Sequence, residues 1–74
     1  MSNDSDNSPF TIRVDEVDPS NSYVGIANAG SAENAPLWQI KLVTVSGSVT
    51  SILFANGNDF FLNKWTDRAT LTYS

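Results

Sequence analysis

Alternating apolar and polar residues predict a β-strand near the beginning of the chain. In the stretch 9–17, Phe10, Ile12 and Val14 fall on one face, and Thr11, Arg13 and Asp15 fall on the other. A period of two residues is typical of a half-buried strand. A turn is expected directly afterwards, because residues 18–22 are rich in Asp, Pro, Ser and Asn.

Further strands are predicted at 23–27, 37–45, 49–55 and 69–73. The strongest is 37–45, in which Trp38, Ile40 and Leu42 share one face. Gly25 lies inside the strand 23–27 and indicates a bulge or a close backbone approach. Asn56-Gly57 is a dipeptide favoured in type I′ turns. The stretch 58–65 fits either a strand or a short helical turn, and residues 65–68 fit a turn.

This order of short strands and turns predicts an all-β fold. We expect a small antiparallel sheet or partly open barrel of five to six short strands, with an extended N-terminal arm. Residues 1–8 are predicted to be a flexible acidic arm, because no apolar residue follows Met1 there. Residues 9–74 are expected to form a single small β domain.

Composition excludes most familiar catalytic chemistry. The 74 residues include no Cys and no His, so disulfides, thiolate nucleophiles, imidazole bases and the common zinc motifs are excluded. The chain is therefore expected not to be an enzyme, and to carry no catalytic residue, cofactor or metal. The carboxylates at 15, 16 and 18 and the stretch 56–59 carry oxygen ligands. Their spacing favours a solvated strand end and a plain turn.

Charge and size point toward protein partners. The net charge is −4, and residues 1–18 hold five acidic residues against one basic residue, whereas 19–74 sum to zero. Four basic residues do not provide the basic groove that nucleic acids need. No apolar run is long enough to cross a bilayer. Because small cores stabilise weakly, assembly with other subunits is the favoured source of further stability.

Five residues are candidate interface residues. Trp38 is expected to fill the core, whereas Trp65 is either a core lid or an interface anchor. Asp67 and Arg68 form a local ion pair, or Arg68 reaches across an interface, where arginine is enriched. The complete set of candidates is Phe10, Arg13, Trp65, Asp67 and Arg68.

A group of motifs between Tyr23 and Tyr73 resembles small, uncharacterised proteins of tailed bacteriophages. These motifs are Tyr-x-Gly at 23–25, Gly-Ser at 30–31, Trp-x-Ile at 38–40, Asn-Gly at 56–57 and Trp-x-x-Arg at 65–68. The resemblance implies a phage source and a part of the virion. Residues 1–22 do not match this pattern.

The resemblance and the residue chemistry together predict a non-enzymatic structural component of the virion. It is expected in multiple symmetric copies, packed by strand edges and arm against other phage structural proteins, in the tail, neck or fibre junction. It is expected in virions after synthesis in the host cytoplasm. One alternative is a capsid decoration protein. Another is a phage-encoded binding module for a host protein or glycan.

Overall fold

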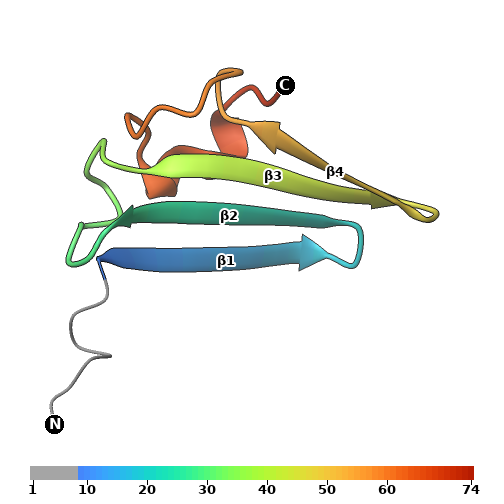
Figure 1. The fold of residues 1–74 in the computed structure, drawn as a ribbon, viewed down its shortest axis with the longest axis horizontal. Coiled ribbons are helices and arrows are strands. Elements are labelled where there is room, and N and C mark those ends of the chain that lie inside the picture. Colours follow the sequence, from blue (N-terminus) through green and yellow to red (C-terminus); the bar gives the residue numbers. More distant parts are fainter. Residues whose placement is uncertain (1–8) are drawn as a thin grey trace, which may run out of the picture.

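The chain forms one antiparallel sheet in which neighbours in the sequence are neighbours in space (Figure 1). A computed structural model describes residues 9–74, so the predicted arm at 1–8 lies outside the described residues. The strands are β1 (Phe10–Asp18), β2 (Asn21–Asn28), β3 (Gln39–Ser46) and β4 (Val49–Phe54), and the 3₁₀ helix η2 (Trp65–Thr70) follows them. The all-β class and the antiparallel sheet are thus confirmed.

Two tight turns make the outer hairpins. Asp18 closes the β1–β2 turn, because its Oδ1 accepts hydrogen bonds from the Ser20 backbone N–H at 2.8 Å and from Asn21 Nδ2 at 3.1 Å. These bonds, the one from the Asn21 side chain first, lower the pKa of Asp18. Gly47 is the first residue of the β3–β4 turn and has φ of 61°. Glycine adopts this conformation without steric cost.

The prediction of five to six strands is wrong in the last third of the chain. The type I′ turn is confirmed, since Asn56 and Gly57 have φ of 59° and 70° and Asn58 N donates to Ala55 O at 3.4 Å. The chain then crosses one face of the sheet without forming a further strand. The predicted strand 69–73 is reduced to one bridge between Ala55 and Tyr73, because η2 occupies residues up to Thr70.

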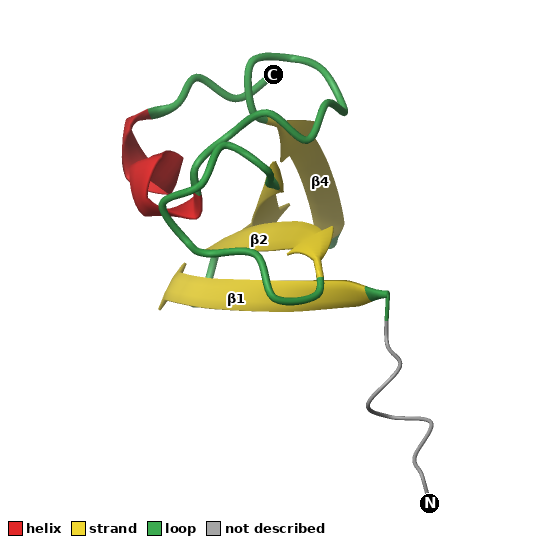
Figure 2. Ribbon diagram, turned by 90° about the vertical axis from the view of Figure 1, so that its left-hand side faces the viewer, coloured by secondary structure: helices red, strands yellow, loops and turns green. Residues whose placement is uncertain are grey.

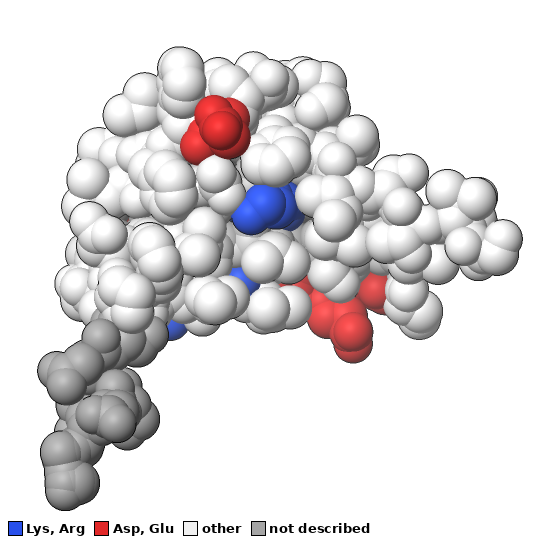
Figure 3. All heavy atoms as spheres, viewed as in Figure 1, with Lys and Arg blue, Asp and Glu red and all other residues white. Residues whose placement is uncertain are grey.

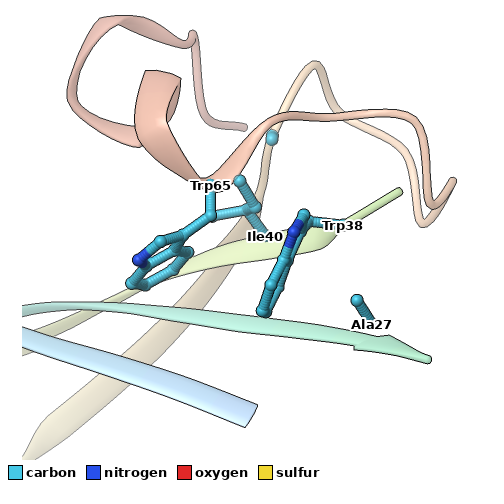
Figure 4. Packing of buried hydrophobic residues seen from close by; sticks show 5 residues of the cluster. Ala27, Trp38, Ile40 and Trp65 are labelled. Carbon is cyan, nitrogen blue, oxygen red and sulfur yellow. The ribbon is translucent and has the colours of Figure 1, made fainter. Parts of the chain in front are cut away.

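Two indoles, tilted by 36° to each other, fill the core. Trp38 and Trp65 have ring centroids 5.8 Å apart and are 0% and 5% exposed (Figure 4). Trp38 is held at both ends: its Nε1 donates to Ala32 O at 2.9 Å, and its backbone pairs with Asn63. The prediction that Trp38 fills the core is confirmed. Ala27, Ile40 and Ala55 complete the buried cluster.

Gly25 explains how both indoles fit against the sheet. A Cβ at this position would lie 2.5 Å from Trp65 Cε3 and 3.1 Å from Trp38 Cε3. Such distances lie below van der Waals contact, so only a glycine lets both rings lie on β2. The predicted close approach at Gly25 is confirmed, with a side chain as the approaching group.

The sheet has one covered face and one open face. Figure 2 shows the loops and η2 gathered on one side of the curled sheet. The open face is defined here by the side chains that share the side of Ile12, since directly paired residues point the same way. Its apolar members are Phe10, Ile12, Val14, Val24, Ile26, Val43, Val45, Ile52 and Phe54.

The orientation of β1 reverses the usual arrangement of a half-buried strand. Its polar residues, Arg13 among them, turn toward the covered face, whereas Ile12 and Val14 are 58% and 67% exposed on the open face. The physical reason lies in the core: the indoles accept a cationic side chain from β1 instead of a further aliphatic one.

Candidate interaction surface

Two arginines flank the paired indoles on the covered face. The Arg13 guanidinium lies 5.7 Å from the centroid of Trp38, and that of Arg68 lies 4.6 Å from the centroid of Trp65. Both distances are within the range of a cation–π interaction. Arg68 Nη1 also donates to Trp65 O at 3.1 Å. These four side chains form one block that attaches η2 to the sheet.

Ion pairs hold both arginines in place. Arg13 Nε donates to Glu33 at 2.9 Å, and Arg68 Nε donates to Asp15 at 2.9 Å. Arg68 thus bonds to a carboxylate on β1 instead of pairing locally with Asp67. Asp67 is exposed, and its backbone carbonyl accepts a bond from Thr70 Oγ1.

The five candidate interface residues therefore separate into three places. Trp65, Arg68 and Arg13 belong to the covered face, where Trp65 is packed inside the chain and the arginines remain partly accessible. Asp67 lies on the outside of η2. Phe10 belongs to the open face and is 45% exposed. The structure thus brings Trp65 and Arg68 together, and it separates both from Phe10.

The open face presents nine apolar side chains from all four strands. Four strands spaced by about 4.8 Å, with about six residues rising about 3.3 Å each, give an area of roughly 400 Å². The largest apolar patches on monomeric proteins have this size and are often functional. A single cation, Lys41, lies among the apolar members, and its Nζ is 5.5 Å from the centroid of Phe54.

A hollow continues the open face at one end. It has a volume of about 370 Å³ and is lined by Phe10, Asn28, Leu37 and Phe61. Phe61 belongs to the sequence Phe60-Phe61-Leu62, in which all three side chains are exposed. The apolar surface therefore extends from the strands onto the loop that follows β4.

Sequence patterns contain a signal for the open face. Apolar residues occur in direct succession in β3 and β4, as in Leu42-Val43 and Ile52-Leu53-Phe54. Adjacent apolar residues in a strand point to opposite faces. Such runs are typical of sheets that are buried on both faces.

Acidic side chains gather at the other end of β1. Figure 3 shows red atoms near the β1–β2 turn on a surface that is otherwise mostly uncharged. Glu16 and Asp18 are exposed there, next to the register shift that interrupts the pairing of β1 with β2. Charges and irregular pairing are features that protect a strand edge from unwanted pairing.

Residues 9–74 contain no cluster of three or more carboxylates suited to a metal ion. No helix within the described part of the chain has the length and apolar character of a membrane span. Burial raises the pKa of Tyr73 to about 12, with a further contribution from Tyr23 and an opposing one from Arg68. The Tyr73 hydroxyl donates to Arg68 O at 2.8 Å, so this shift reports packing under η2.

Comparison with known proteins gives no match: no family model, curated protein or solved structure resembles the chain. These comparisons therefore add no family, relative or partner to the structural findings.

Proposed function

We propose that this protein is a non-catalytic structural subunit of a tailed-bacteriophage particle, present in several copies and packed through its sheet against neighbouring subunits. The tail, neck or fibre junction is the proposed location. The observation that carries the proposal is the open face, which is apolar on a sheet whose other face already holds the core. A sheet with two apolar faces is typical of a sheet covered on both sides.

The energetics favour a partner over water on this face. Full burial of one aliphatic side chain contributes about 1.5–3 kcal/mol. Ile12, Val14 and Ile52 are each more than half exposed. Covering them would therefore supply an amount comparable to the roughly 3–5 kcal/mol that a core of this size provides.

The phage assignment adds the source of the partners. It rests on the resemblance of the motifs from Tyr23 to Tyr73. Repeated copies in a symmetric particle present the same surface many times, so a small module gains stability from neighbours. A decoration protein or a host-directed binding module would use the same apolar surface differently.

Mass spectrometry of purified particles tests the proposal. We expect the protein at a fixed ratio to a known structural component. Its absence from particles, with the protein present in lysates of infected cells, would contradict the structural role and favour a host-directed binding module.

A matched pair of variants tests the open face itself. Ile52→Asp places a charge on the open face, whereas Val49→Asp places one on the same strand at the β3–β4 turn. The two positions are 55% and 61% exposed, so neither change affects the core. We expect Ile52→Asp to be excluded from particles and Val49→Asp to be incorporated. Equal incorporation of both would rule out packing through this face.

A further inference from the structure

Within residues 9–74, the two edges of the sheet differ in how far other segments cover them. At the β4 edge, Phe54 exchanges backbone hydrogen bonds with Ser74, each 3.1 Å long, and Asn56 N donates to Thr72 O. The C-terminal residues thus occupy the end of β4. Strand β1, with nine residues the longest strand, is the other edge of the sheet.

The phase of the ladder shows which backbone groups of β1 face outward. Ala29 N donates to Pro9 O at 3.2 Å, and this pair continues the register of Phe10 with Asn28. Hydrogen-bonded and non-bonded pairs alternate along an antiparallel ladder. The odd-numbered residues of β1 therefore bond to β2, and Ile12 and Val14 direct their N–H and C=O groups to the edge. Ile12 O has one long contact, 3.5 Å from Arg13 Nη1.

We propose that β1 pairs antiparallel with β1 of a second copy of this chain, about a two-fold axis at Val14. This inference names a partner for the assembly role proposed above and in that respect rests on it. Charge complementarity selects the register. An axis at Val14 places Arg13 of each copy opposite Asp15 of the other, which gives two cross-strand pairs of opposite charge.

Neighbouring registers fit less well. An axis at Arg13 places this cation opposite its own copy, and like charges in direct opposition destabilise a sheet. With an axis at Ile12, Phe10 is the last strand residue of the facing copy and Asp15 lies past its end. This register therefore forms no charge pair. The axis at Val14 instead uses Ile12 to Glu16, the part of β1 that pairs regularly with β2.

The side chains have the spare hydrogen-bonding groups that this register needs. Arg13 uses Nε and Nη1, and Asp15 uses Oδ2, for bonds within one copy. Arg13 Nη2 and Asp15 Oδ1 make no bond within residues 9–74, and the Arg13 and Asp15 side chains are 42% and 38% exposed. Their meeting across the axis would join the pairs Glu33–Arg13 and Asp15–Arg68 of the two copies into networks of alternating charge. The two open faces would also become one continuous apolar surface.

Single cysteine variants test the register directly, because the natural chain has no cysteine. A hydrogen-bonded antiparallel pair separates the two Cα atoms by about 5.5 Å, within the range of a disulfide. We expect Val14→Cys to give a disulfide-linked dimer under mild oxidation, and Ile12→Cys and Ile52→Cys to remain unlinked. Linkage of Ile12→Cys alone would refute the axis at Val14. Linkage of Ile52→Cys alone would show that the open faces stack, and would refute edge pairing.

Sedimentation equilibrium of the full chain provides the second readout. We expect a species of twice the chain mass of 8.0 kDa at micromolar concentration. Val14→Pro removes an outward N–H that β2 does not use, so this variant should be folded by circular dichroism and monomeric by sedimentation, whereas Val14→Thr should remain a dimer. A monomeric natural chain would overturn the inference. If particles contain the protein but Val14→Cys does not link, the dimer fails and the structural role stands. If Val14→Cys links but particles lack the protein, the dimer stands and the structural role fails.

Discussion

Gly25→Ala is a small change with a large expected effect, because two indoles occupy the space of the new methyl group. The added Cβ would lie 2.5 and 2.7 Å from two carbon atoms of Trp65 and 3.1 Å from one of Trp38. Gly25 is not among the residues with positive φ, so alanine suits the backbone and would stabilise an open site by about 0.4–1 kcal/mol. Overpacking costs about 1–3 kcal/mol, and it exceeds that gain.

The rings cannot move aside easily. Trp38 is bound through its Nε1 and its backbone, and Trp65 packs against both Trp38 and Arg68. We therefore expect Gly25→Ala to lose about 1–3 kcal/mol of unfolding free energy. In a domain of this size each kcal/mol lowers Tm by roughly 4–8 °C.

Denaturant unfolding followed by tryptophan fluorescence measures this loss. A double-mutant cycle with Trp65→Phe isolates its cause, because the smaller ring lacks the atoms that the new methyl group would meet. We expect Gly25→Ala to cost clearly less in the Trp65→Phe background than in the natural chain. A Gly25→Ala variant as stable as the natural chain, or equal costs in both backgrounds, would refute the reasoning.

Three further predictions follow from the core. Trp38→Ala removes a side chain that is 0% exposed and should cost about 3–5 kcal/mol, so far-ultraviolet circular dichroism should show an unfolded chain; a native spectrum and melting point would contradict this. Asn63→Ala removes the acceptor of Asn56 Nδ2 and the donor to Trp38 O and should cost about 1–3 kcal/mol in denaturant unfolding, whereas Asn34→Ala on the surface should have no effect. Tyr73 has its pKa raised from 10.0 to about 12, so its contribution to stability is complete below pH 10 and is lost as the pH rises toward 12. The stability difference between the natural chain and Tyr73→Phe should therefore decrease over this range, and a constant difference would argue against a buried Tyr73 hydroxyl.

The sequence allows the strands to be predicted better than the sides to which they turn. Alternation located β1, and the pattern around Trp38 and Ile40 correctly indicated the core of β3. A period of two residues does not state which face is inside. In β1 the polar side faces the core, because Arg13 lies over an indole and Asp15 binds Arg68, a residue 53 positions away. Such long-range partners leave no mark in a local pattern.

The candidate surface was predictable only in part. Phe10, a candidate interface residue from the sequence, is 45% exposed at the end of the open face. The continuous open face was missed, because its members come from four strands and become neighbours only through the register. Tryptophan is a residue type that often anchors interfaces. The Trp65 side chain is instead buried against the sheet, in the space that Gly25 leaves.

The order in which the chain is synthesised has a consequence for how the core closes. All four strands precede Trp65, and the covered face receives Trp65, Leu71 and Tyr73 only from residues 65–74, which follow the last strand. While that segment is still inside the ribosome, the emerged strands have an apolar surface on both sides. Nascent chains with exposed apolar surface and strand edges are the species that chaperones bind. Emergence of residues 65–74 therefore turns an aggregation-prone nascent sheet into a domain with a closed core.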